Sequence, residues 1–271
     1  MTSRQVVSLI RACHFQPTLA VTVFVVALSV AAGRGWGAVS GGLAVLSGQM
    51  TVGWSNDYLD RERDRVAGRV DKPLAAHEIS PSLVRSCAFG AAIACIPLSF
   101  LSGWRAAAVH LIAVAVALVY NAWLKATVFS VLPYLIAFGL LPAFVSLGAT
   151  THRWPPGWIM IAAAMLGGGA HFVNTLPDLQ ADAASGMRGL PHRLGATGSL
   201  RIGVALFGLA AALVAANADR LGSLGVALVV ANALAVIGVF GAAAIGQERT
   251  AWTLTLLAAA FTVVLYLARA A

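Results

Sequence analysis

Long apolar segments make up most of this 271-residue chain and constrain its fold more than any other feature. A helix needs about 20 apolar residues, within a range of roughly 17–25, to cross a bilayer. Only 10% of the residues are charged, against about 25% in soluble domains. The sequence therefore predicts an all-α membrane protein with one integral-membrane domain over residues 1–271. Its nine expected transmembrane helices cover approximately residues 17–32, 36–55, 83–103, 105–122, 130–149, 157–175, 200–216, 222–246 and 251–268.

The distribution of Lys and Arg predicts how these helices are oriented. With a cytoplasmic N-terminus and nine crossings, 13 of the 18 basic residues fall on the cytoplasmic side and 5 on the other, as the positive-inside rule expects. Two long polar loops, about 56–82 and 176–199, are then cytoplasmic. We expect a multi-pass protein of the cytoplasmic membrane, in which the net charge of +8 reflects this bias and not a nucleic-acid partner. The first segment resembles a signal peptide, but the later segments favour a retained helix.

Acidic residues are concentrated around the two polar loops. Eight of the ten lie in these loops or at the adjoining helix ends. Residues four apart share one face of a helix, so a carboxylate at every fourth position forms a row. Both loops begin with the spacing N-x₃-D-x₃-D, which comprises Asn56, Asp60 and Asp64 in the first and Asn174, Asp178 and Asp182 in the second. In the first loop, Asp57 adds one more carboxylate, three residues before Asp60.

The match between the loops continues downstream of the acidic residues. Gly68 and Gly186 each follow the last Asp by four residues, and Pro73 and Pro191 each follow that glycine by five. The two loops come after the second and the sixth apolar segment. The sequence therefore predicts two degenerate four-helix repeats with a ninth helix added, an arrangement that membrane proteins use to place equivalent sites across an interface.

Two rows of carboxylates that face each other need a counter-ion, because like charges at close range do not all stay ionised. Carboxylate oxygens suit Mg²⁺, which also takes substrate phosphate as a ligand. The pattern therefore indicates a site that grips a diphosphate through Mg²⁺, aided by nearby cations. The alternative is that these are solvated loop charges with Asn and Asp as helix caps. The repeated spacing in a chain with so few acids favours the first interpretation.

At these residues the chain resembles the UbiA superfamily of intramembrane prenyltransferases. The first motif of that family corresponds to Asn56, Asp57, Asp60 and Asp64, and the second to Asp178 and Asp182. Further resemblance lies in Lys72-Pro73-Leu74, in the pair Tyr120 and Lys125, and in the stretch Leu190 to Gly195. His77 departs from the family, which often has a small residue there. The resemblance implies nine helices around a central cavity open to lipid, with Mg²⁺ and an allylic polyprenyl diphosphate as donor.

The function expected from motifs and resemblance together is transfer of a prenyl group to an electron-rich acceptor, an aromatic ring or a lipid. Asp57, Asp60, Asp64, Asp178 and Asp182 are the expected catalytic residues, and with Asn56 the expected Mg²⁺ ligands. The diphosphate is expected to contact Arg63, Arg69, Lys72, Lys125, Arg188 and Arg193. The acceptor or prenyl cavity is expected to include Arg11, His14, Trp54, Tyr120, Tyr134, His171 and Asn174, although core packing or interfacial anchoring would also explain the aromatic residues.

Other functions share some of these features. A terpene cyclase of the same fold would use the same motifs and turn the cation on its own chain. A multi-pass transporter also has internal repeats and polar residues, but its charges should lie within the spans, whereas these lie at the ends. A non-enzymatic scaffold gives no reason for the repeated acidic spacing. The sequence identifies neither the acceptor nor the length of the prenyl chain.

Overall fold

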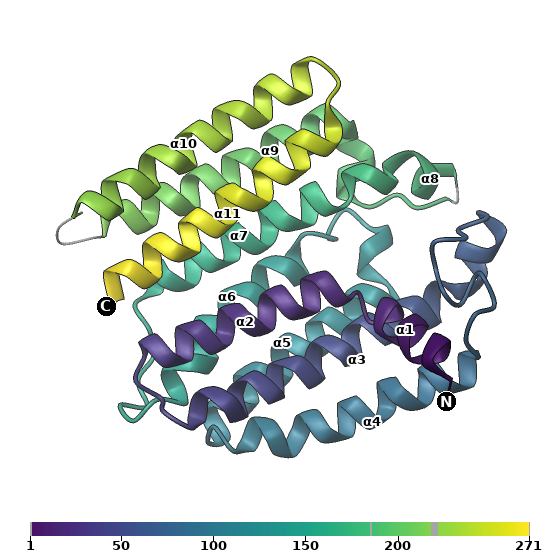
Figure 1. Cartoon of the computed structure of the whole chain (residues 1–271), viewed down its shortest axis with the longest axis horizontal. Helices are drawn as coiled ribbons and strands as arrows, with labels where there is room; N and C mark the ends of the chain where they lie inside the picture. The colour runs from purple at the N-terminus through teal and green to yellow at the C-terminus, as the bar shows by residue number, and fades with distance from the viewer. Residues whose placement is uncertain (1, 185, 218–221, 271) are drawn as a thin grey trace. The chain divides into compact units, whose positions relative to one another are not determined.

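The computed structural model describes residues 2–184, 186–217 and 222–270, and the secondary structure over these ranges is helical, without a strand. The chain divides into two compact units (Figure 1). Unit 1 comprises residues 1–125 and 143–154, and unit 2 comprises residues 126–142 and 155–271. The expected all-α class is confirmed for the described residues.

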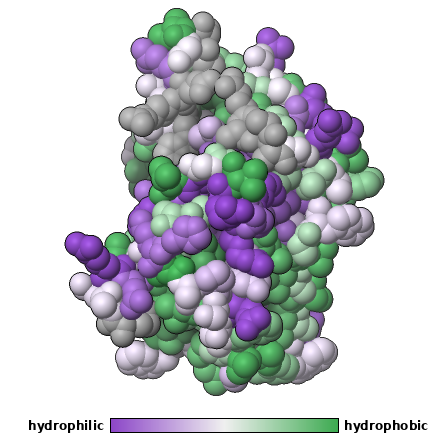
Figure 2. Space-filling view, turned by 90° about the vertical axis from the view of Figure 1, so that its right-hand side faces the viewer, coloured by the Kyte–Doolittle hydropathy of each residue, from purple (hydrophilic) through white to green (hydrophobic). Residues whose placement is uncertain are grey.

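Unit 1 is built around the long helix α3 (Gly37–Val66), which packs against α2 (Phe15–Ala31), α4 (Pro81–Phe100) and α5 (Trp104–Ala122). A short helix α1 (Ser3–Ala12) precedes α2, and the pair is bent by 68° at the break between them. The turn η1 (Leu124–Ala126) follows α5. Figure 2 shows hydrophilic side chains gathered on the end of the molecule that bears α1.

Unit 2 contains α7 (Gly157–Asn174), which packs closely on α9 (Leu190–Ala216), and the antiparallel pair α10 (Ser223–Ala244) and α11 (Glu248–Ala270). The turn η2 (Leu176–Asp178) and the short helix α8 (Leu179–Ala184) connect α7 to α9. Helix α6 (Leu132–Leu147) continues from unit 2 into unit 1.

Five helical segments of the described residues are long and apolar enough to cross a membrane by themselves, and the bent pair α1–α2 would make a sixth. The protein is thus a multi-pass membrane protein. Each of the nine expected segments lies largely in a helix, but α6 is short, and α3 is rich in Gly and Ser over its apolar part. The count of nine spans therefore stays a prediction. The five segments are Pro81–Phe100, Trp104–Ala122, Gly157–Asp178, Leu190–Ala216 and Ser223–Ala242.

The helices differ from the expected segments at three places. Helix α3 continues through the first acidic motif to Val66, so residues 56–66 are helical and not loop. Helix α9 begins at Leu190, ten residues before the expected span, and is kinked at Gly195, where φ is +70°. Helix α1 was not expected, because it is too short and too polar to register as a span. All three differences lie beside the acidic motifs.

Close backbone contact fixes α3 against the break between α1 and α2. A Cβ atom on Gly53 would lie 2.2 Å from the carbonyl oxygen of Cys13, which is the residue at the break. Trp54 adds a hydrogen bond from its indole nitrogen to the carbonyl of Leu9, at 2.9 Å. Small residues let membrane helices approach in this way. The contact holds His14, the next residue along, beside the acidic end of α3.

Candidate active site

The first acidic motif lies on the last three turns of α3, beyond its apolar part. Asp57, Asp60 and Asp64 lie three and four residues apart, so they share one face of the helix. All three are buried, with 1%, 7% and 8% of their surface exposed. Carboxylates are almost never buried unless they are paired with cations. The partners of each carboxylate therefore indicate which ligands this face of α3 can bind.

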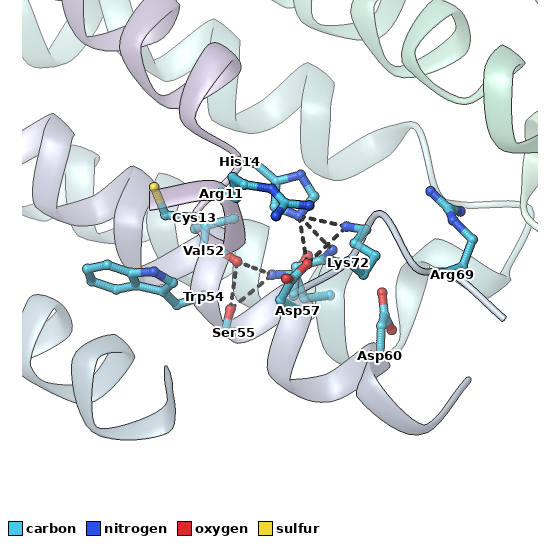
Figure 3. Close-up of polar contacts among 12 residues, drawn as sticks. Arg11, Cys13, His14, Val52, Trp54, Ser55, Asp57, Asp60, Arg69 and Lys72 are labelled. Atoms are coloured by element: carbon cyan, nitrogen blue, oxygen red, sulfur yellow. Dashed lines mark hydrogen bonds and ion pairs between the residues drawn. The ribbon is translucent and has the colours of Figure 1, made fainter. Parts of the chain in front are cut away.

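Asp57 meets two cationic or polar partners from outside α3 (Figure 3). Its Oδ1 accepts a hydrogen bond from Lys72 Nζ at 2.9 Å and lies 3.2 Å from His14 Nε2. Burial raises the pKa of Asp57, but the hydrogen bond to His14 and the charge of Lys72 more than offset this, so the pKa is held below its ordinary value. Its Oδ2 is buried and has no hydrogen-bond partner within the described ranges of the chain.

His14 reaches this cluster because the backbone turns sharply at that residue. His14 precedes α2 in the left-handed conformation, with φ of 55° and ψ of 58°, which is uncommon for a residue other than glycine. Its Nε2 lies 3.2 Å from Lys72 Nζ and 3.4 Å from Asn56 Nδ2. The side chains of His14, Asp57 and Lys72 thus point toward one another from three separate segments (Figure 3).

Asp60 is paired with cations on both of its oxygens. Oδ1 accepts from Lys125 Nζ, and Oδ2 lies 2.8 Å from Arg63. Lys125 comes from the turn η1 and also donates to Asn56 Oδ1 at 3.3 Å. Burial lowers the pKa of Lys125, and the charge of Asp60 opposes this. A segment 65 residues away in sequence therefore brings Lys125 to the helix face that Lys72 also contacts.

Asp64 differs from the other two carboxyls. Burial raises its pKa above the ordinary value, the charge of Lys72 lowers it, and the neighbouring Asp60 raises it again. An additional cation close to this row of carboxylates would lower the pKa of Asp64, since opposite charge favours the ionised form.

The oxygens of this face suit a hard divalent cation. Carboxylate and amide oxygens are the protein ligands that Mg²⁺ prefers, and the unpartnered buried Oδ2 of Asp57 leaves one acceptor unused. Among the described residues, no three His, Cys, Asp or Glu side chains are gathered as a preformed metal site. Instead, Lys72, Lys125 and Arg63 pair with the carboxylates of Asp57 and Asp60. The residues therefore fit Mg²⁺ if the cationic side chains move onto a ligand.

The second acidic motif has a different local structure. Asn174 is the last residue of α7, Asp178 ends the turn η2, and Asp182 lies on α8. Pro177 lacks a backbone N–H and so interrupts the helix. The expectation that this motif forms one continuous helical row is therefore wrong. Asp182 Oδ2 lies 3.6 Å from His192 Nε2.

The turns that follow the two motifs nevertheless have the same backbone geometry. Gly68 and Gly186 both adopt positive φ, +67° and +84°. The next residue donates its N–H to the carbonyl of the last Asp of the motif, Asp64 or Asp182, at 2.9 Å in each case. This is the glycine-ended helix termination in which orphan carbonyls are satisfied. The spacing shared by the sequences is thus matched by a shared local structure.

A model of the UbiA prenyltransferase family matches residues 17–244, which is most of the chain. The chain belongs to the UbiA prenyltransferase family. A search of curated proteins gives no match.

Solved structures of UbiA homologues have the same fold. A UbiA homologue from Aeropyrum pernix K1 in its apo form is 20% identical, with a TM-score of 0.71 over 90% of this chain and 97% of that one. A homologue from Archaeoglobus fulgidus bound to GPP and Mg²⁺ is 20% identical, with a TM-score of 0.70 over 96% and 99%. A digeranylgeranylglyceryl phosphate synthase is 15% identical, with a TM-score of 0.71 over 98% of each chain.

Several residues expected near the diphosphate or in the cavity of this UbiA-family chain have local partners. Trp54 is buried in a hydrophobic cluster with Ala12 and points away from Asp57 (Figure 3). Arg11 pairs with Glu78 at 3.0 Å, and Arg69 pairs with Asp71 at 2.9 Å. In Figure 3, Arg69 lies apart from the cluster of His14, Asp57 and Lys72.

The remaining expected residues lie in or beside unit 2, apart from Tyr120, which is half-buried on α5. His171 is buried on α7, with its ring 4.8 Å from that of Tyr134 and its Nε2 3.0 Å from Ser130 Oγ. Asn174 is exposed. Arg188 and Arg193 are both exposed, and the side chain of Arg193 donates to the carbonyl of Arg188 at 3.2 Å.

Sequence reasoning missed His192, whose side chain is 6% exposed beside Asp182. A lone histidine between proline and arginine has no spacing that indicates a site. The only available signal was its place within the Leu190–Gly195 stretch that resembles the family. Sequence reasoning also assigned His14 to the acceptor cavity, whereas its ring contacts the Asp57 cluster directly.

Proposed function

We propose that this chain is a Mg²⁺-dependent membrane prenyltransferase that moves a prenyl group from an allylic diphosphate to an electron-rich acceptor, most simply an aromatic ring. One observation carries the proposal: of the three buried carboxylates on one face of α3, Asp57 is paired with Lys72, and Asp60 with Lys125 and Arg63. A face that holds oxygen ligands and mobile cations together suits a metal–diphosphate complex. The bound GPP and Mg²⁺ of the Archaeoglobus fulgidus relative support the same assignment.

Mg²⁺ would be held by Asn56, Asp57, Asp60 and Asp64 in unit 1 and by Asp178 and Asp182 in unit 2. When bound, it neutralises the charge that grows on the leaving diphosphate. Asp57 is prepared for this role, because its pKa lies below the ordinary value and it stays ionised at neutral pH. Its unpartnered Oδ2 is free to accept a ligand without breaking an existing bond.

The lysines have a second role in the proposal. Lys72 and Lys125 compensate the carboxylates in the ligand-free protein. Their flexible stems let the ammonium groups turn to diphosphate oxygens once the carboxylates bind the metal. Arg63 lies on α3 beside Asp60 and would act in the same way. Arg69, Arg188 and Arg193 contribute positive charge from the two turns.

The allylic C–O bond then ionises, and the diphosphate leaves with the bonding electron pair. The carbocation is captured by the acceptor, which loses the proton from the atom that forms the new bond. Apolar side chains exclude water, which would otherwise quench the cation. Tyr120, Tyr134, His171 and Asn174 are proposed to line the path of the acceptor or the prenyl chain, and π faces stabilise a nearby cation. Since Trp54 and Arg11 have partners elsewhere, we give them supporting roles only.

The proposed architecture has nine spans around a central cavity within one domain, formed by two four-helix repeats and a ninth helix. Both acidic motifs would contribute to one site. Support for the repeat comes from the matched turns at Gly68 and Gly186. The N-terminus and both motif turns would be cytoplasmic, on the basis of the Lys and Arg distribution.

A mass-spectrometric screen tests the proposed reaction. Purified protein is incubated with allylic diphosphates of several chain lengths and with aromatic or lipid acceptors, in Mg²⁺ or in EDTA. We expect a prenylated acceptor that forms only in Mg²⁺. Cyclic products from diphosphate alone would identify a terpene cyclase, and no product from any donor would contradict the proposal.

Cysteine accessibility tests the topology. Single cysteines placed at positions 67 and 187, just after the two motifs, are labelled from one side of sealed vesicles in a background without Cys13, Cys87 and Cys95. We expect both to be labelled from the cytoplasmic side. Labelling from opposite sides would exclude two facing motifs.

A further inference from the structure

The side chain of His192 is buried with its hydrogen-bonding capacity unused. It is only 6% exposed, and both ring nitrogens are buried without a hydrogen-bond partner among the residues that the structure describes. Asp182 Oδ2 lies 3.6 Å from Nε2, beyond hydrogen-bond distance. Buried polar groups are nearly always satisfied, and an unsatisfied group calls for an explanation. The imidazole therefore has a donor and an acceptor available to a further partner.

The matched position of the first motif holds an aliphatic residue instead of a histidine. Leu74 follows Pro73 as His192 follows Pro191, at the same distance from the matched glycines. Leu74 is 5% exposed and belongs to a hydrophobic cluster of unit 1. The shared spacing of the two motifs is thus compatible with an aliphatic side chain after the proline. The imidazole of His192 is therefore a feature of the second motif alone.

The backbone around His192 is held firmly. The N–H of Leu190 donates to Ser130 Oγ at 3.0 Å, and Ser130 Oγ also lies 3.0 Å from His171 Nε2. Ser199 Oγ donates to the carbonyl of Pro191 at 3.0 Å. These bonds fix both sides of His192 within unit 2. The backbone beside His192 is thus held in position, and Nε2 of its ring lies 3.6 Å from Asp182 Oδ2.

A neutral imidazole has one N–H donor and one acceptor nitrogen. Mg²⁺ prefers oxygen ligands, so the ring is not suited to bind that metal. The N–H instead suits an anionic oxygen, and a phosphate oxygen beside the second motif would satisfy it. We propose that His192 positions the prenyl donor by donating a hydrogen bond to an oxygen of its diphosphate.

This inference rests on the proposed function and adds a residue to its donor site. The role is a positioning one, since it requires no proton transfer. The expected consequence is specific: removal of the imidazole weakens binding of the diphosphate and leaves the stability of the protein without ligand unchanged. If His192 only filled space, its removal would lower the stability of the protein and leave diphosphate binding unchanged.

The test measures binding of geranyl S-thiolodiphosphate, an unreactive analogue of an allylic diphosphate, by calorimetry in detergent with Mg²⁺. We expect His192→Leu to weaken binding about tenfold to a hundredfold, the loss typical of a hydrogen bond to a charged group. Inorganic diphosphate should show the same loss, because the contact is to the diphosphate. The ligand-free stability of His192→Leu should equal or exceed that of the wild type.

His192→Asn keeps an N–H donor and should recover part of the affinity, which guards against a folding defect in the leucine variant. His152→Asn, in unit 1 after α6, is the matched control and should bind as the wild type does. Unchanged affinity in His192→Leu, with the wild type binding normally, would overturn the inference and leave the proposed function standing. A loss of affinity matched by an equal loss of ligand-free stability would also overturn it. A wild type that binds neither probe would contradict the proposed function itself.

Discussion

Gly53→Ala tests the contact that holds His14 beside the acidic end of α3. The new Cβ would lie 2.2 Å from the carbonyl oxygen of Cys13, 2.6 Å from its carbon and 2.9 Å from its Cα. All three are backbone atoms, so no side chain can turn aside. Overpacking of a closely packed contact costs about 1–3 kcal/mol, and we expect a loss near the upper end, about 3 kcal/mol.

The structure offers a matched control on the neighbouring helix. A Cβ on Gly90 of α4 would meet no atom within 4 Å. Gly90→Ala should therefore gain roughly 0.5–1 kcal/mol from the better helix propensity of alanine. The two variants make the same chemical change within helices, so the difference between them isolates the contact with Cys13.

Unfolding of each variant by titration with SDS from mixed micelles gives the free energies. Because Cys13 precedes His14, Gly53→Ala should also weaken binding of geranyl S-thiolodiphosphate, whereas Gly90→Ala should not. Equal stability of the two alanine variants would refute the close contact between α3 and the α1–α2 break. Lower stability with unchanged ligand binding would refute its connection to the site.

His77→Gly should raise the free energy of unfolding by roughly 1 kcal/mol, because His77 has a φ of +57° that disfavours residues other than glycine; a loss in the same SDS titration would contradict this. Lys125→Met should weaken thiolodiphosphate binding about tenfold or more, while Arg65→Met, on the exposed side of α3, should leave it unchanged in calorimetry. Asp57 has a pKa below its ordinary value of 3.8. In EDTA, ionised Asp57 should therefore add to the free energy of unfolding above pH 3.8, and this contribution should be lost as the pH falls through the lowered pKa. Asp57→Asn should flatten this acid dependence of unfolding, and an unchanged dependence would argue against the pairing with Lys72.

Hydrophobicity predicted where the helices lie because burial in lipid dominates their energetics. It could not predict α1, which is short and carries Arg4 and Arg11, nor the turn at His14 that breaks the first pair. The early start of α9 was missed because its first residues, including Arg193, are polar enough to be read as loop.

Spacing predicted the acidic row on α3, because three- and four-residue steps define a helix face wherever the helix continues. The same spacing failed at Asp178, since Pro177 replaces the helix by a tight turn. Lys72 and Lys125 were predicted from resemblance to contact diphosphate, whereas their carboxylate partners depend on how distant segments meet. That information is tertiary and is not contained in local spacing.

The most direct test of the account asks whether both acidic motifs are needed for the same reaction. Product formation from an allylic diphosphate in Mg²⁺ is measured by mass spectrometry for the wild type, Asp60→Asn and Asp178→Asn, with Glu62→Gln as the control, an exposed carboxylate paired with Arg65 on α3. The account predicts a loss of about 100-fold or more in both Asp variants, no effect in the control, and no product from the wild type in EDTA. Full product formation by either Asp variant would contradict the assignment of these motifs as the active site.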